Sequence, residues 1–152
     1  MYDVLLLLHL VAVVVGFGGV LLNGLYAAQA KKRPGPGGVA IAEANFFVSN
    51  RVAEMAIYLV PLFGFGLIGA SDSAWSLSDS WILGALVLYV IGLLNAKLVL
   101  QPTNRRVIEM MRDGAPDEAA MNAADKRMAA AGGFAHLIFL VIMILMIWKP
   151  GA

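Results

Sequence analysis

The sequence predicts an all-α integral membrane protein, a four-helix transmembrane bundle with both termini on the outer side (N-out/C-out). Hydrophobic residues make up 61% of the 152 residues and charged residues only 14%, with a mean hydropathy of +0.81. A soluble domain of this size cannot bury so much apolar surface. Four apolar runs are each long enough to cross a bilayer core of about 30 Å, which takes roughly 20 helical residues. The basic residues also gather beside alternate connections, as in multi-pass membrane proteins.

We expect one integral membrane domain, residues 1–152, whose helices cover about residues 4–28, 46–70, 81–100 and 116–148. Strands are a poor alternative, because the runs are continuous rather than alternating and four strands cannot close a membrane barrel. The first run is too long for a signal-peptide core and no basic region precedes it, so we expect it to be a retained helix.

The second predicted helix contains Pro61, which should kink it and free a backbone carbonyl for a neighbour or a water molecule. Small residues let helix backbones approach closely in lipid. Glycines that could serve this purpose gather on the first two helices, at Gly16, Gly18, Gly19, Gly24, Gly64, Gly66 and Gly69. We interpret them as packing surfaces.

Between the third and fourth helices the sequence predicts a cytoplasmic amphipathic helical segment. Thr103 is expected to cap it, Ile108 lies on its apolar side and Gly114 ends it. Pro116 should open the fourth helix, which we expect to project from the membrane as an alanine-rich stalk before it enters the bilayer. Trp75, Trp81 and Trp148 are expected to form an aromatic belt at the outer face.

Orientation follows from the charges. Ten of the eleven basic residues flank the first and third connections, and only Lys149 lies beside the other membrane face. The excess of Lys and Arg marks cytoplasmic loops. The sequence therefore predicts that the first and third connections are cytoplasmic.

His9 is the first polar residue at membrane depth, about 8 Å into the first apolar run at 1.5 Å per residue. An imidazole there can ligate haem iron, relay protons, or simply donate a hydrogen bond to a carbonyl. His136 belongs to the other leaflet, so the two histidines should lie about 15–20 Å apart, too far for one iron. The chain has no cysteine and no recognised metal motif, and no metal site is predicted.

A polar intramembrane cluster is expected toward the cytoplasmic side, with contributions from all four helices. Its predicted members are Asn23, Arg51, Glu54, Asn95, Lys97 and His136. Glu54 needs a partner at this depth, and Arg51, Lys97 or His136 could supply it. The cluster could bind a headgroup, a small anion or a proton. Alternatively, it could be an ion-pair network that fixes helix register, with Lys97 and Arg51 snorkelling to lipid phosphates. Arg51 and Glu54 are placed on one face by their i, i+3 spacing.

A family resemblance rests on motifs spread over almost the whole chain. They are His9, Gly18-Gly19, Trp75-Ser76, Asp79-Ser80-Trp81, Pro102, Arg127 and the ending Met146 to Pro150. In order and spacing they resemble the bacterial integral membrane family "domain of unknown function 2269", which implies the bacterial inner (cytoplasmic) membrane. That family is distantly similar to the CopD copper-resistance and HemJ membrane proteins. The HemJ resemblance implies His9 as an axial ligand of haem b.

Three functions stay open at this level. The first is an accessory or scaffold component of a membrane complex, with the lipid bilayer and a larger complex or a homo-oligomer as partners. The second is a haem- or porphyrin-binding membrane protein that uses His9. The third is transport of a small ion or copper past the polar cluster. Whether the protein is an enzyme is undecided, and nothing indicates nucleic-acid binding, because topology accounts for the basic residues.

Overall fold

Four long helices form the protein in a computed structural model that describes residues 1–114 and 117–151. No strand occurs in these described ranges, and four helices are long and apolar enough to cross a membrane. The predicted all-α fold with four spans is therefore confirmed. In chain order the elements are α1 Tyr2–Lys31, α2 Pro36–Phe47, η1 Val48–Ala53, α3 Glu54–Gly69, α4 Ser80–Asn95, η2 Ala96–Leu100, α5 Gln101–Arg112 and α6 Glu118–Trp148, where η1 and η2 are π-helical turns.

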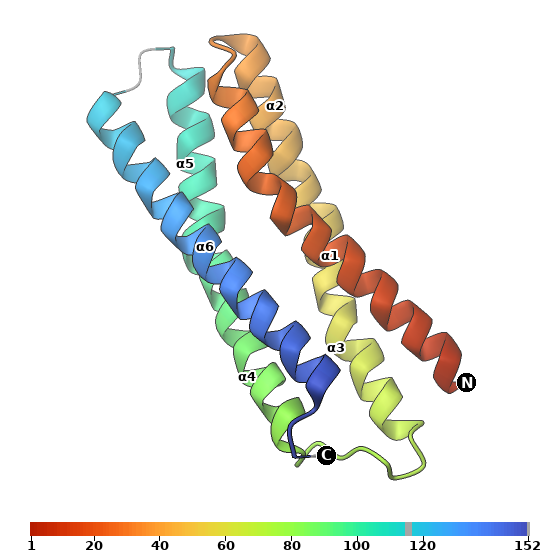
Figure 1. Cartoon of the computed structure of the whole chain (residues 1–152). Helices are drawn as coiled ribbons and strands as arrows, with labels where there is room; N and C mark the ends of the chain where they lie inside the picture. The colour runs from red at the N-terminus through yellow and green to blue at the C-terminus, as the bar shows by residue number, and fades with distance from the viewer. Residues whose placement is uncertain (115–116, 152) are drawn as a thin grey trace.

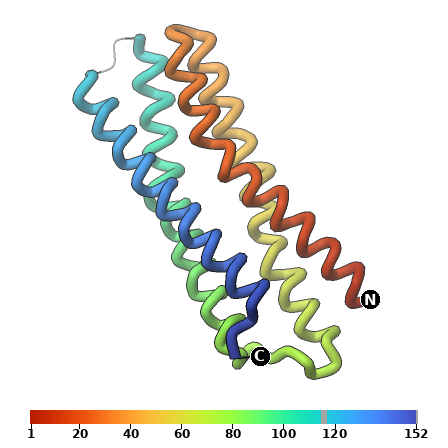
Figure 2. The backbone as a smooth tube through the Cα atoms, in the orientation of Figure 1, coloured from red at the N-terminus to blue at the C-terminus, as the bar shows by residue number. Residues whose placement is uncertain are grey.

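The helices pair as two antiparallel hairpins, α1 with α2–η1–α3 and α4–η2–α5 with α6 (Figure 1). The hairpins meet where α2 packs against α5 and α1 against α6. Both chain ends and the α3–α4 connection lie at one end of the bundle, here named the terminal end (Figure 2). The α1–α2 connection, with Lys31, Lys32 and Arg33, lies at the opposite end, here named the basic end.

The second helix begins at Pro36, about ten residues before the start that the sequence predicted. Gly35 precedes it with φ 73°, a left-handed conformation that glycine adopts at no steric cost, and Pro36 stands at the first helical position, where its missing N–H is not needed. A Cβ at Gly38 would strike the carbonyls of Ala30 and Arg33. The Pro- and Gly-rich stretch is thus a tight turn followed directly by the start of α2.

The third helix does not end near residue 100, as predicted, but continues through η2 and α5 to Arg112. Pro102 cannot donate a hydrogen bond and its ring conflicts with the carbonyl four residues earlier, that of Leu98. The π-helical turn η2 contains Leu98, and the wider turn accommodates the proline without ending the helix. Thr103 consequently lies inside a continuous helix and does not cap one. Gly114, with φ 74°, follows the end of the helix.

The amphipathic segment is therefore α5, and it packs against α2 and α6 instead of lying apart. Ile108 of α5 is buried with Ala30 and Ala42 at the basic end. The early part of α6 also packs against this end and does not project alone as a stalk. The predicted start at Pro116 lies outside the described residues, and α6 begins at Glu118, capped by the Asp117 carboxylate.

Two ion pairs join neighbouring helices at the basic end. Lys31 of α1 pairs with Asp125 of α6 at 2.6 Å, and Arg112 of α5 pairs with Glu43 of α2 at 2.6 Å. All four residues are partly accessible, so the pairs contribute modestly to stability. They link helices from both hairpins beyond the apolar spans.

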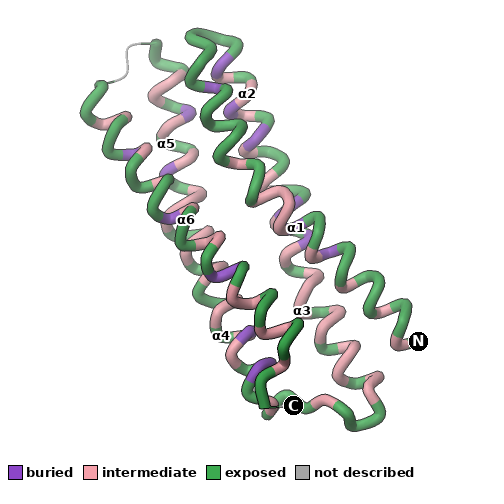
Figure 3. The backbone as a smooth tube through the Cα atoms, in the orientation of Figure 1, coloured by how far each residue is buried: buried purple, intermediate pink, exposed green. Residues whose placement is uncertain are grey.

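Exposed residues run along the whole length of each helix (Figure 3). Many are large and apolar, such as Leu7 and Leu25 on α1 and Leu98 on η2. Exposing so much apolar surface to water would be unfavourable, whereas lipid tails solvate it. Between α1 and α3, small residues do the packing. A Cβ on Gly16 would lie 2.8 Å from Ile57 Cγ1, so α1 and α3 touch almost backbone to backbone there.

The tryptophans at the terminal end do not form a uniform lipid-facing belt. Trp81 is buried, 6% exposed, and meets Trp75 edge to face at 5.5 Å between ring centroids. Lys149 ends α6 in the left-handed conformation, and its ammonium lies 4.2 Å above the Trp75 ring. This cation–π contact ties the C-terminal segment to the connection between α3 and α4. Trp148 is the member of the three that is widely exposed.

Candidate intramembrane polar site

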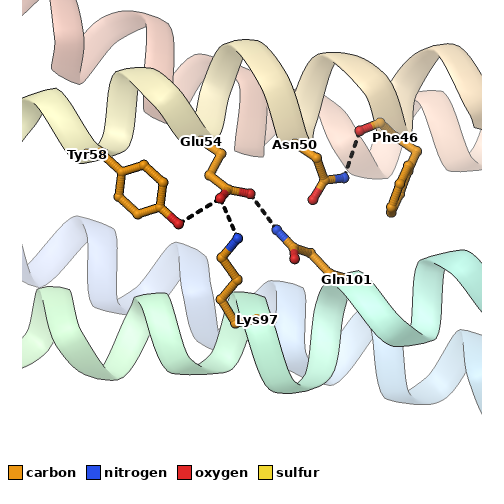
Figure 4. Close-up of polar contacts among 6 residues, drawn as sticks. All are labelled: Phe46, Asn50, Glu54, Tyr58, Lys97 and Gln101. Atoms are coloured by element: carbon orange, nitrogen blue, oxygen red, sulfur yellow. Dashed lines mark hydrogen bonds and ion pairs between the residues drawn. The ribbon is translucent and has the colours of Figure 1, made fainter.

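The Glu54 carboxylate lies between the two hairpins and has partners on both of its oxygens (Figure 4). Oε1 accepts a hydrogen bond from the Tyr58 hydroxyl at 2.6 Å and forms an ion pair with Lys97. Oε2 accepts a hydrogen bond from Gln101 Nε2 at 2.6 Å. We call these four residues the Glu54 cluster. They join α3 to η2 and α5, in a region where an unpaired carboxylate would be costly.

Helical spacing positions the cluster. Tyr58 follows Glu54 by four residues and Gln101 follows Lys97 by four, so each pair shares a face of its helix. Both helices also widen at this level, because η1 ends just before Glu54 and η2 contains Lys97. Single π-helical turns inside α-helices occur frequently at functional sites.

Of the three partners considered for Glu54, Lys97 is the one in contact. Arg51 has no ion pair within residues 1–114 and 117–151, and it lines a groove between α1 and α3 instead. The i, i+3 argument fails because Arg51 belongs to the π-helical η1. More residues per turn mean a smaller rotation per residue, so three residues no longer return to the same face.

The other predicted members bond elsewhere. Asn95 Nδ2 donates to the carbonyl of Ala131 at 2.9 Å, which links α4 to α6. His136 Nε2 lies 3.5 Å from the carbonyl of Val20 on α1. Asn23 Oδ1 accepts from the Ser49 hydroxyl at 2.6 Å, which links α1 to η1. The six predicted residues therefore do not form one pocket, and only Glu54 and Lys97 of them meet.

His9 lies near the terminal end, half-buried between α1 and α3. Its Nδ1 is 2.9 Å from the carbonyl of Val60, so Nδ1 carries the proton and donates. The ring lies beside Gly64, where a Cβ would be in ordinary van der Waals contact with His9 Cε1 at 3.5 Å. Fixing the Nδ1 proton leaves Nε2 as the nitrogen with a free lone pair. The donor set fits one axial haem ligand, and the described residues hold no group of three metal-ligating side chains.

A further polar contact follows from Pro61. The proline leaves the carbonyl of Ile57 without its helical donor, and the hydroxyl of Tyr89 on α4 lies 3.5 Å from that oxygen. The sequence predicted the free carbonyl and did not identify its partner. Tyr58 and Gln101 were also missed. Their i+4 spacing from Glu54 and Lys97 is the signal that could have found them.

Residues 3–150 match the sequence model of a family described as predicted integral membrane proteins, DUF2269. No significant match was found among curated proteins or among solved structures. The relation to CopD and HemJ proteins stays a prediction. With nearly its whole length matched, the chain belongs to the DUF2269 family of integral membrane proteins.

Proposed function

We propose that this protein is a non-catalytic accessory component of a larger membrane complex, to which it contributes a rigid helical framework. The observation that carries the proposal is the use of the polar groups at membrane depth. Five interhelical contacts join neighbouring elements in a closed ring: α1 to η1 through Asn23, α1 to α3 through His9, α3 to η2 and α5 through Glu54, α4 to α6 through Asn95, and α6 to α1 through His136.

Such a ring suits a framework better than a transport path. Interhelical hydrogen bonds in membrane proteins average about 0.6 kcal/mol each, so the set holds the helices in one register. Of the residues first considered for ion transport, Glu54 and Lys97 pair with each other, whereas Arg51 lines the groove and His136 lies beside the Val20 carbonyl. An ion that passed Glu54, Lys97 and His136 would have to break bonds of the framework.

The outer surface supports docking of another membrane protein. Gly24 on α1 and Gly133 on α6 are exposed, and a Cβ at either would meet nothing within 4 Å. Each has a small exposed residue four positions away, Ala28 and Ala129. Gly16 and Gly19, in contrast, are used for packing inside the chain. The unused glycines leave flat faces on which a partner's transmembrane helix can lie closely.

The test is the size of the particle extracted from native membranes in mild detergent, measured by native electrophoresis. We expect a particle larger than one or two copies of the 16.2 kDa chain. Gly24→Leu or Gly133→Leu should release the chain from it without changing the melting temperature. Gly19→Leu is the matched control, because it should lower the melting temperature. Migration of the wild-type chain alone would refute the accessory role.

A second candidate is haem binding through His9, favoured by the Val60 contact that leaves Nε2 free. Haem would supply redox or porphyrin chemistry, and His9 would hold its iron. The chain purified from cells fed a haem precursor should then show a Soret band that His9→Ala abolishes. Colourless wild-type protein would exclude this role and leave His9 as a structural contact.

A further inference from the structure

Arg51 is a cation within the apolar part of the chain, and the described residues supply no ion-pair partner for it. It is exposed, and within residues 1–114 and 117–151 no carboxylate pairs with it. Every other polar residue predicted at this depth bonds across to another helix. A guanidinium has five donors in a planar fork that matches the oxygens of a phosphate or carboxylate. In a low-dielectric surrounding it requires an anion, and that anion must come from outside the chain.

An apolar groove begins at Arg51 and follows α1 and α3 toward the terminal end. Its volume is about 430 Å³. Ala12 and Ala56, 5% and 8% exposed, lie at its floor, where their short side chains leave the hollow. Val11 and Met55, 50% and 61% exposed, border its open side. The groove thus opens sideways to the place that lipid tails occupy.

The dimensions fit one lipid chain in one leaflet. From Arg51 to Phe63, the lining residue nearest the terminal end of α3, the helix rises about 18 Å at 1.5 Å per residue. One leaflet contributes roughly 15 Å of the 30 Å hydrocarbon core. From Arg51 to Ala70, where α3 ends, the rise is about 28 Å. This rise nearly equals the thickness of the hydrocarbon core. If Ala70 lies at one face of the core, the Arg51 guanidinium therefore lies close to the phosphates of the leaflet at the basic end.

We propose that this groove is a binding site for an anionic glycerophospholipid, whose phosphate pairs with Arg51 and whose acyl chain lies between α1 and α3. With the basic end in the cytoplasm, as the charge distribution predicts, the lipid belongs to the inner leaflet. The positive charge of Arg51 favours a lipid over a partner's transmembrane helix as the occupant of the groove. Such a helix would need an acidic residue at this depth, whereas lipids carry a phosphate at this level in any case.

The test is native mass spectrometry of the full chain, delipidated in detergent and titrated with phosphatidylglycerol or phosphatidylcholine of the same acyl chains. We expect one tightly retained phosphatidylglycerol. Arg51→Gln should weaken its retention about tenfold, since a charge-assisted hydrogen bond is lost, and should weaken phosphatidylcholine retention less, because the choline cation offsets the charge of its phosphate. Arg33→Gln is the matched control, because it removes the same charge from an exposed turn outside the groove.

A second variant probes the apolar half of the site. Val11→Trp fills the groove from its exposed border and should reduce phosphatidylglycerol retention with Arg51 intact. Far-UV circular dichroism verifies that each variant is folded. Equal retention by wild type and Arg51→Gln would overturn the proposal, and so would an equal loss in Arg33→Gln. A photo-crosslinker at Val11 that captures a protein instead of lipid in native membranes would assign the groove to a partner helix and refute the lipid site.

Discussion

The close approach of α1 and η1 gives a sharp test of the packing, the substitution Gly19→Ala. A Cβ on Gly19 would lie 2.6 Å from the Cβ of Ala53, which is 1% exposed. Favourable carbon–carbon separations are about 3.5–4.0 Å, so the helices would have to move apart by about 1 Å. The opposing methyl is fixed to the backbone and cannot rotate away. Overpacking of this kind costs about 1–3 kcal/mol.

Gly24→Ala is the matched control on the same helix. Its new Cβ meets nothing within 4 Å. Both substitutions gain the same helix propensity, roughly 0.5–1 kcal/mol for alanine over glycine, so this contribution cancels when the two are compared. We therefore expect Gly24→Ala to be more stable than Gly19→Ala by about 1–3 kcal/mol. Reversible unfolding in mixed micelles with increasing SDS, followed by circular dichroism, measures the difference.

A double-mutant cycle separates the clash from other effects. Ala53→Gly removes the opposing methyl, so in the Gly19→Ala background it should restore part of the lost stability, although alone it weakens the helix. Equal stability of Gly19→Ala and Gly24→Ala would refute the close packing of α1 on η1. A purely additive double mutant would show that Ala53 is not the residue that Gly19 faces.

Two further predictions use the same unfolding assay. Lys97→Met leaves the Glu54 carboxylate without its cation and should cost about 1–2 kcal/mol, between the values for exposed and for buried pairs. Adding Glu54→Gln should then cost less than it does in the wild type, and full additivity would deny the ion pair. Tyr89→Phe should cost about 0.6 kcal/mol through the lost bond to the Ile57 carbonyl. In a Pro61→Ala background a helical N–H satisfies that carbonyl, so Tyr89→Phe should be neutral; an unchanged cost would refute the assignment.

The sequence predicted the four spans because hydropathy measures how favourably a segment transfers into lipid. Each apolar run is long and hydrophobic enough to be identified in this way. It did not predict how far the helices continue beyond the bilayer. Residues 36–45 and 101–112 are helical although they are less apolar, since they pack on one another around Ala42 and Ile108. A hydropathy threshold therefore gives the membrane boundary and not the helix boundary.

The polar residues were also only partly predictable. That Glu54 needs a partner follows from the cost of a carboxylate in lipid, and Lys97 was among the candidates. The choice between Lys97 and Arg51 depended on η1, a π-helical turn that has no sequence signal comparable to the proline behind η2. Periodicity counted at 3.6 residues per turn assigns Arg51 to the wrong face. The tertiary structure is needed to correct it.

The π-helical turn η1 explains why one helix carries both an inward acid and an outward base. A strictly α-helical segment would set Arg51 beside Glu54, and the two would neutralise each other on α3. The wider turn η1 separates them, so Glu54 remains available to Lys97 and Gln101 across the interface between the hairpins. Arg51 is left to face the apolar groove. The same local distortion thus links the hairpins on the inside and creates an unpaired cation on the lipid side, which connects the proposed framework role to the proposed lipid site.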